Sequence, residues 1–221
     1  MILEINLTQV IENENTTEII HLCFTEFNER IMERKYVEEK TFDKTDFTKT
    51  TFITGDYESC HFVNCNFSDA ELNGTHFIDC SFTACNISNA KLNKTAFRDI
   101  QFKDCKLLGL QFFDANTFLF SASFADCILN HSSFYKMNVK KIKFNNSSLQ
   151  EVDFTEADLS NAVFNNCDLS RAIFENTILE KADFLTSFNY SIDPELNRIK
   201  KAKFSLPAVI GLLGKYDIVI E

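Results

Sequence analysis

The chain has 221 residues, of which 45% are apolar and 24% are charged, and it carries a net charge of −10. This length fits one domain with a sizeable core, and no run of about eighteen apolar residues is present to cross a membrane. The acidic balance argues against direct binding to nucleic acid, which relies on clustered Lys and Arg. The amino-terminal segment is acidic and lacks the basic start of a secretory signal, so we expect a cytoplasmic protein.

Residues 1–35 are predicted to form an amino-terminal cap. A helix from Thr16 or Thr17 to Arg34 is expected there, because a Thr followed by Glu is a helix-start signal. The segment fits poorly to the repeat that fills the rest of the chain, since Arg30 and Lys35 are too large for its small inward positions.

From Phe42 onward, every fifth residue is large and apolar. The series runs without exception from Phe42 to Phe112, shifts by two residues, and continues from Leu119 to Phe184. Neither an α-helix nor a single strand gathers residues of this spacing on one face. The pattern fits a chain that turns a corner every five residues, so that four sides close a square coil of about 20 residues. We therefore predict an all-β solenoid of about seven coils over residues 36–190.

Two residues before each large position the chain is mostly small, as at Cys60, Ala70 and Thr75. The segments EADLS, NCDLS and KADFL resemble the A(D/N)LXX motif of the pentapeptide-repeat family. The resemblance covers about residues 36–186 and implies a right-handed quadrilateral β-helix, with the central and the small residue both inside. Asp at the position before the centre is interpreted as a turn former.

Seven of the eight cysteines fall on the small inward position. A single file of small residues does not place four ligands around one point, so we predict buried, reduced thiols with no metal and no cofactor. Only Cys23 lies outside the pattern. The seven are Cys60, Cys65, Cys80, Cys85, Cys105, Cys127 and Cys167.

The two-residue shift of the repeat lies within residues 113–118. Two additional residues have to bulge from a coil there, which leaves Phe113 or Phe118 partly outward. A tolerated bulge and a contact loop are both compatible with this pattern, since loops on rigid scaffolds often carry binding. The candidate loop residues are Phe113, Asp114, Asn116 and Phe118.

Residues 191–221 are predicted to form a helical cap that also joins two copies of the chain. A helix is expected to start at Asp193-Pro194-Glu195 and to run towards Lys203. An apolar patch follows Pro207, and a one-sided apolar segment after a solenoid either caps the last coil or mediates dimerisation. In the quinolone-resistance branch of the family the carboxy-terminal helix mediates dimerisation, so a homodimer is expected. The dimerisation candidates are Val209, Ile210, Leu212 and Leu213.

The charges divide the solenoid into three parts. Residues 36–85 carry nine acids and three bases, residues 86–149 carry four acids and nine bases, and residues 150–185 carry eight acids and two bases. The basic residues between Lys136 and Lys143 are a candidate contact for an acidic partner, although a solvated face is the favoured interpretation. The partner-binding candidates are Glu151, Asp153, Glu156, Asp158, Asp168, Glu175, Glu180 and Asp183.

The resemblance includes the quinolone-resistance and microcin-immunity branches, whose members bind DNA gyrase or topoisomerase IV. Several of these members resemble duplex DNA in width and charge. It implies a protein that protects a type II topoisomerase from quinolones or toxins. The chain departs from these members because it lacks the long loops that some of them use and has a modest net charge. The alternative is an interaction scaffold for an unrelated protein partner.

An enzyme is not expected. The four histidines are dispersed, no Gly-rich phosphate loop or metal-binding motif occurs, and repeated Asp at the turn position is explained by backbone geometry. No catalytic residue is assigned.

Overall fold

A computed structural model describes residues 34–216, 218 and 219 of the chain. The described residues from Lys35 onward belong to one compact unit. The expected amino-terminal helix and Cys23 lie outside the described residues.

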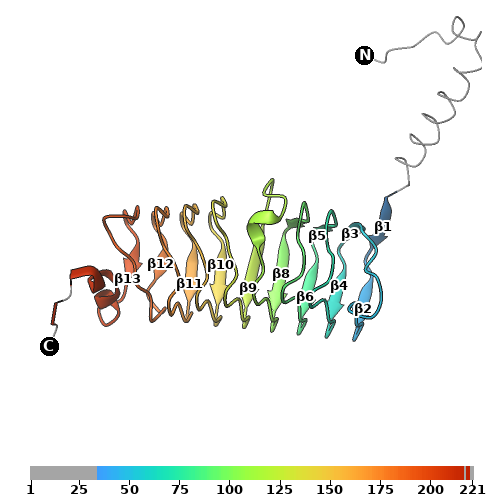
Figure 1. The fold of residues 1–221 in the computed structure, drawn as a ribbon, viewed down its shortest axis with the longest axis horizontal. Coiled ribbons are helices and arrows are strands. Elements are labelled where there is room, and N and C mark those ends of the chain that lie inside the picture. The colour runs from blue at the N-terminus through green and yellow to red at the C-terminus, as the bar shows by residue number, and fades with distance from the viewer. Residues whose placement is uncertain (1–33, 217, 220–221) are drawn as a thin grey trace, which may run out of the picture. The chain divides into compact units, whose positions relative to one another are not determined.

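Short parallel strands stack in register along the described unit (Figure 1). One sheet has four strands, in the order β1-β3-β5-β7, and the other has nine, in the order β13-β12-β11-β10-β9-β8-β6-β4-β2. The first sheet contains β1 (Lys35–Glu38), β3 (Gly55–Glu58), β5 (His76–Ile78) and β7 (Ala96–Arg98). The second contains β2 (Thr41–Asp43), β4 (His61–Val63), β6 (Ser81–Thr83), β8 (Ile100–Lys103), β9 (Ala122–Ala125), β10 (Lys143–Asn145), β11 (Val163–Asn165), β12 (Asp183–Phe184) and β13 (Lys203–Phe204).

Each coil has four sides, which we number in chain order. The four-stranded sheet begins the first side, and the nine-stranded sheet forms the second. The third side is linked by single bridges such as Asn66 to Asn86, and the fourth by bridges such as Ser133 to Asp153. The fold is a parallel β-solenoid of about eight turns, which confirms the predicted solenoid class.

The core is a set of stacked side chains at the predicted central positions. Along the second side, rings of successive coils lie parallel at centroid distances such as 4.7 Å between Phe62 and Phe82. The same stacking runs from Phe42 to Phe204. These distances match the spacing of neighbouring strands, so the backbone ladder and the ring column reinforce each other.

The corners repeat a left-handed backbone conformation. Residues two after most centres have positive φ, for example Asp69 at 57° and Asn89 at 57°. Asn and Asp tolerate this region better than most residues, yet Lys141 and Arg171 also adopt it. The stacked coils on both sides hold these corners in place.

The phase shift is taken up between Asn116 and Ala122. Ala96 pairs with Asn116, whereas Ile100 pairs with Ala122, so the offset between paired residues grows by two across this segment. The short helix η1 (Phe112–Asp114) precedes this loop. The prediction that Leu119 resumes the central series is wrong: Leu119 is 61% exposed, and Phe120 packs against the core instead. The left-handed corner at Leu119 turns its side chain outward and brings the next ring inward.

The carboxy-terminal helix expected from Asp193 to Lys203 is absent, because these residues form a further coil. Arg198 bridges to Ile178, and the ring of Phe204 stacks on Phe184 at 5.3 Å. Asn197 explains the difference, since its buried side chain donates to the carbonyl of Phe174 and accepts from the backbone of Thr177. Short helices do follow, as the 3-10 turns η2 (Val209–Leu212) and η3 (Gly214–Tyr216).

Truncating one ring of the central column should strongly lower stability. Phe144 is fully buried between Phe124 and Phe164, so Phe144→Ala is expected to reduce the free energy of unfolding by about 3–5 kcal/mol. Chemical denaturation followed by circular dichroism measures this change. The matched control Phe118→Ala removes a ring that is 68% exposed and should change stability by less than about 0.5 kcal/mol. Equal effects of both substitutions would contradict the column as the source of stability.

Candidate functional site

The eight acidic residues predicted between positions 150 and 185 do not form one surface. Asp158 lies on the first side, Asp183 on the second and Asp168 on the third, in bridges or strands of those sides. Asp153 lies on the fourth side. The structure therefore distributes this set around the solenoid.

Most of these acids also have a cation or a backbone partner nearby. Asp158 lies 3.2 Å from the Lys140 ammonium, Glu180 2.7 Å from Arg198 and Asp183 3.0 Å from Lys203. Glu156 lies 3.5 Å from Lys136, and Glu151 contacts both Arg171 and His131. Their charge is thus largely offset locally. Glu175 is exposed and has no ion pair within the described part of the chain.

The aspartates in this set have the turn role predicted for them. The carboxylates of Asp153, Asp158, Asp168 and Asp183 each accept a hydrogen bond from the backbone N–H two residues later, at 2.9 to 3.1 Å. Burial opposes ionisation of Asp158, but hydrogen bonds from Ser160 and the nearby Lys140 outweigh it and lower the pKa of this carboxyl. These side chains are explained by the fold itself.

A denser group of carboxylates lies on the first side of the amino-terminal coils. Glu38 of β1 stands directly opposite Glu58 of β3, and Asp56 precedes Glu58 on the same outer face of that strand. Asp79 and Asp99 occupy equivalent corners of the next two coils. We call this group the N-terminal acidic surface, and it comprises Glu38, Glu39, Asp56, Glu58, Asp79 and Asp99.

Local hydrogen bonds orient two of these carboxylates. The Tyr36 hydroxyl donates to Glu58 at 2.7 Å, and this hydrogen bond, with burial and the charges of Glu38 and Glu58, raises the pKa of Tyr36 to about 12. The Asp56 carboxylate lies 2.8 Å from the imidazole of His76. Like charges that face each other across neighbouring strands destabilise a sheet, so the opposed Glu38 and Glu58 are not explained by stability.

Sequence reasoning missed this surface although its signal was present. Residues 36–85 carry nine acids against three bases, but the predicted site was placed near the carboxy terminus. Sorting charges by the length of one coil would have aligned Glu38 with Glu58 and Asp79 with Asp99. The total charge of a segment does not reveal which side of a square coil carries it.

The loop near the phase shift exposes two aromatic residues. Phe113 is 40% exposed and Phe118 is 68% exposed, so both rings point outward. The sequence had predicted an outward position for one or the other. The loop projects beyond the neighbouring coils in Figure 1. Asp114 and Asn116 instead hold the backbone: the Asp114 carbonyl accepts from Lys94 at 3.0 Å, and the Asn116 side chain accepts from the Phe118 N–H at 3.0 Å.

The basic residues from Lys136 to Lys143 do not form one patch. Lys136 lies at the corner between the fourth and first sides, and Lys140 lies on the first side. Lys143 begins β10 on the second side. Lys136 and Lys140 are already paired with Glu156 and Asp158, so about half of the charge of this group is balanced locally.

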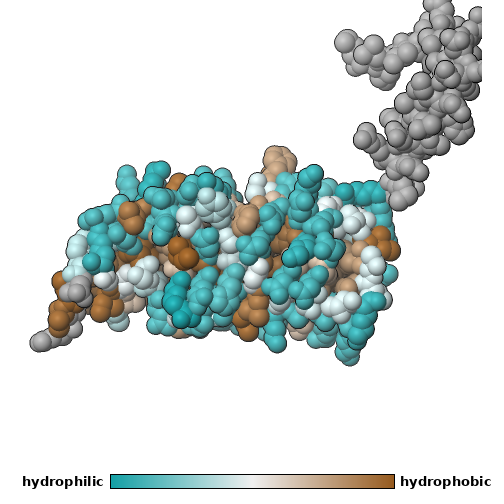
Figure 2. All heavy atoms as spheres, viewed as in Figure 1, coloured by the Kyte–Doolittle hydropathy of each residue, from teal (hydrophilic) through white to brown (hydrophobic). Residues whose placement is uncertain are grey.

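The carboxy-terminal turns cover the last coil and still expose apolar side chains. Leu212 packs against the core, Val209 and Leu213 are half-buried, and Ile210 is 54% exposed. Leu206 is 87% exposed, and apolar atoms are visible at this end in Figure 2. This segment therefore caps the solenoid and leaves part of its apolar surface uncovered.

Close contacts fix the position of this cap. A Cβ at Gly211 would lie 2.2 Å from the carbonyl oxygen of Tyr190, so only glycine fits there. The Ile192 N–H donates to the Gly211 carbonyl at 2.9 Å. Lys215 contacts Asp193 at 2.8 Å and Glu195 at 2.6 Å, and it lowers the pKa of both carboxyls.

The seven described cysteines are buried and unpaired, as predicted. Their thiols donate to backbone carbonyls, for example Cys80 to Tyr57 at 3.3 Å. Burial raises the pKa of Cys80 to about 12 and that of Cys167 to about 11. Within residues 34–219 as described, no group of three or more His, Cys, Asp or Glu side chains has an arrangement that could hold a metal ion.

Comparison with known proteins identifies the family. The model described as "Pentapeptide repeat region" matches residues 55–118 and 115–184. The chain belongs to the pentapeptide repeat family. No curated protein sequence matches it. In the part of this pentapeptide repeat protein that the structure describes, no helix has the length and apolar character needed to cross a membrane.

Several solved structures are similar to this pentapeptide repeat protein. A trypsin-treated variant of QnrB1, a plasmid-mediated fluoroquinolone resistance protein, shares 19% identity at a TM-score of 0.46. That match covers 85% of this chain and 92% of the QnrB1 chain. HetL, which is involved in heterocyst differentiation regulation in the cyanobacterium Nostoc, shares 14% identity at a TM-score of 0.29, over 84% and 93% of the two chains. A protein from the Arabidopsis thaliana thylakoid lumen shares 21% identity at a TM-score of 0.33, over 53% and 67%.

The buried thiols of this pentapeptide repeat protein should not react while it is folded. All seven described thiols are buried, so the reagent cannot reach them, and burial also raises the pKa of Cys80 and Cys167 well above 8, which keeps these two protonated. In a Cys23→Ser variant, Ellman's reagent at pH 8 should therefore detect almost no thiol until guanidinium is added, and then all seven. Rapid reaction of several thiols in the folded variant would contradict the inward placement.

Proposed function

We propose that this pentapeptide repeat protein is a non-enzymatic binding protein whose N-terminal acidic surface docks on a type II topoisomerase, either DNA gyrase or topoisomerase IV. It occupies a surface that otherwise holds DNA, and so protects the enzyme from quinolones or toxins. The observation that carries the proposal is the opposed pair Glu38 and Glu58, with Asp56 beside them. Their mutual repulsion is relieved when a basic surface covers them.

The spacing of these carboxylates supports local rather than complete DNA mimicry. Neighbouring strands lie about 4.8 Å apart, and residues two apart on one strand lie about 6.6 Å apart. Duplex DNA carries one phosphate per about 1.7 Å of its axis, or about three per coil of this solenoid. The N-terminal acidic surface supplies between one and two acids per coil, so it matches part of a DNA groove edge.

Membership of the family supports a protein partner but does not identify it, so the partner has to be inferred from the surface of this chain. QnrB1 is described as a fluoroquinolone resistance protein and HetL as a protein of heterocyst differentiation, so one fold serves different roles. A scaffold for an unrelated partner is the second candidate. The outward rings of Phe113 and Phe118 favour it, since exposed aromatic residues are frequent anchors of protein interfaces.

We also propose that two copies associate through the carboxy-terminal cap. Ile210 is 54% exposed, Leu206 is 87% exposed and Val219 is 86% exposed, all at the same end of the solenoid. Exposing a group of apolar side chains to water is unfavourable, and self-association removes this exposure. Association there leaves the N-terminal acidic surface of each copy accessible.

Neutralising the N-terminal acidic surface should weaken topoisomerase binding. In a gyrase supercoiling assay with ciprofloxacin, the native chain is expected to protect activity at low micromolar concentration. The Glu38→Gln, Glu58→Gln double variant should need at least about ten times more protein, a change of about 1.4 kcal/mol. The matched control Glu175→Gln, Glu180→Gln removes two acids elsewhere and should behave as native.

Two results would contradict this proposal. If the control loses protection and the Glu38, Glu58 variant keeps it, the carboxy-terminal acids carry the interaction. If the native chain affects neither gyrase nor topoisomerase IV at tens of micromolar, the DNA-mimic function is wrong and the scaffold candidate remains.

Charged substitutions in the carboxy-terminal cap should separate the two copies. The native chain is expected to elute in light-scattering chromatography at about twice its 25.4 kDa mass. Ile210→Asp combined with Leu206→Asp should give the mass of one chain, because burying two carboxylates in the interface is unfavourable. Phe118→Asp, on a distant exposed loop, is the control and should stay dimeric. A native chain that remains monomeric at every concentration would contradict the proposed dimer.

A further inference from the structure

The first coil separates from the second along the fourth side. In regular coils this side is held by bonds such as Lys91 N–H to the Ala70 carbonyl at 2.9 Å and Leu72 N–H to the Lys91 carbonyl at 3.0 Å. Between residues 48–52 and 68–72 no equivalent backbone bond is formed within the described residues. The ladder is therefore interrupted here over a few residues. A second interruption lies further along the same side, since no bridge or backbone bond joins residues 90–92 to Gln111 within the described chain.

This interruption leaves backbone groups of Glu71 without a partner. By the register of the other coils, its N–H would bond to the carbonyl of Thr50 and its carbonyl to the N–H of Phe52. The Ser68 carbonyl likewise lacks the bond that its equivalent Ser88 receives from Asp69 at 2.9 Å. Within the described chain, no backbone hydrogen bond from the first coil reaches the Ser68 carbonyl, the Glu71 N–H or the Glu71 carbonyl. Such a row of groups is an open strand edge.

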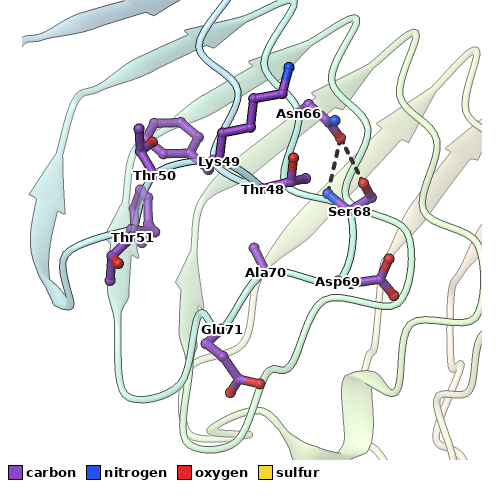
Figure 3. Close-up of a pocket in the computed structure, with 11 residues that line it drawn as sticks. Thr48, Lys49, Thr50, Thr51, Asn66, Ser68, Asp69, Ala70 and Glu71 are labelled. Carbon is purple, nitrogen blue, oxygen red and sulfur yellow. Dashed lines mark hydrogen bonds between the residues drawn. The ribbon is translucent and has the colours of Figure 1, made fainter.

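A hollow of about 560 Å³ lies along this edge. Figure 3 shows Thr50 and Thr51 of the first coil set apart from Ala70, Asp69 and Glu71 of the next. Thr50 occupies the place in the repeat where a small residue should point inward, yet it is exposed. The slot above Ala70 is thus vacated by the chain, and Phe47 and Phe52 form its apolar wall.

The charges at the hollow are acidic. Asp69 and Glu71 line it, and neither has a salt bridge in the described structure. The one lysine in the lining, Lys49, is already paired with Asp46 at 2.9 Å. A ligand that brings a positive charge is therefore complementary to the rim.

We propose that this edge binds an extended peptide of a partner protein by strand addition. The peptide's backbone pairs with Glu71 and Ser68, a small side chain such as Ala enters the slot above Ala70, and an adjacent Lys or Arg meets Asp69 and Glu71. Main-chain pairing supplies affinity in this mode of recognition, and the alternating side-chain pockets supply specificity. The occupied stretch from Ser68 to Asn73 corresponds to a peptide of about six residues. This site does not depend on the topoisomerase proposal.

The chain itself suggests a probe. Residues 89–94 already pair with this segment from its opposite edge, as the bonds of Lys91 show. The probe is the fluorescently labelled, end-blocked peptide Asn-Ala-Lys-Ala-Asn-Lys, in which Ala replaces the equivalent of Leu92 because Phe52 already fills that core position. The control peptide carries an N-methyl group on the second Ala, which removes the donor that faces the Glu71 carbonyl and keeps the charge.

Fluorescence anisotropy with the full chain should show binding of the probe with a dissociation constant at or below about 1 mM, and at least about tenfold weaker binding of the N-methyl peptide. Glu71→Gln combined with Asp69→Asn should weaken the probe about three- to tenfold, whereas the control Glu175→Gln should not. By amide exchange in NMR spectra, the Glu71 N–H should exchange much faster than the Lys91 N–H, and the probe should slow it.

Three outcomes would overturn the proposal. Equal protection of the Glu71 and Lys91 amides without peptide means that the chain closes its own edge. Absence of probe binding up to about 1 mM means that the open edge is only hydrated. Equal binding of the probe and the N-methyl peptide means that charge alone, not strand addition, attracts the peptide.

Discussion

The spacing between neighbouring coils is the constraint on which the rest of this molecule depends. Parallel backbone ladders set a separation of about 4.8 Å, and flat phenylalanine rings stacked at 4.6 to 5.3 Å along the second side fit that separation. Each ring touches the same ring of the next coil, so one residue type at one repeat position builds a continuous core. The strained corners, including Lys141 and Arg171, persist because the coils above and below hold them.

The sequence predicted the core almost completely, because a period of five with a small residue two places earlier leaves few alternatives. Its errors fall where local chemistry competes with the repeat. Asp193-Pro194-Glu195 has the composition of a helix start, but the inward amide of Asn197 completes a coil instead. Leu119 fits the period, yet the corner conformation turns it outward and Phe120 replaces it. Neither outcome is encoded by hydrophobic spacing.

The functional surface was harder to predict, for a geometric reason. A square coil distributes consecutive residues over four sides, so acids close in sequence, such as Asp153 and Asp158, end on different sides. Acids one full coil apart, such as Glu38 and Glu58, become neighbours. The net charge of a sequence segment therefore says little about the net charge of one side of the solenoid. Ion pairs with Lys or Arg in the next coil reduce the net charge of a side further.

The two-residue insertion after Asn116 has a consequence for how such chains change in length. The coils before and after it stack in the same columns, with Phe102 on Phe124 at 5.2 Å, although their numbering is offset. The two added residues lie between the paired positions Asn116 and Ala122, and the ladders resume in the same columns after them. An insertion smaller than a whole turn can therefore be accommodated as a local protruding loop without displacing the coils before and after it. The stacked core fixes the spacing of the coils, and insertions are accommodated between the paired positions.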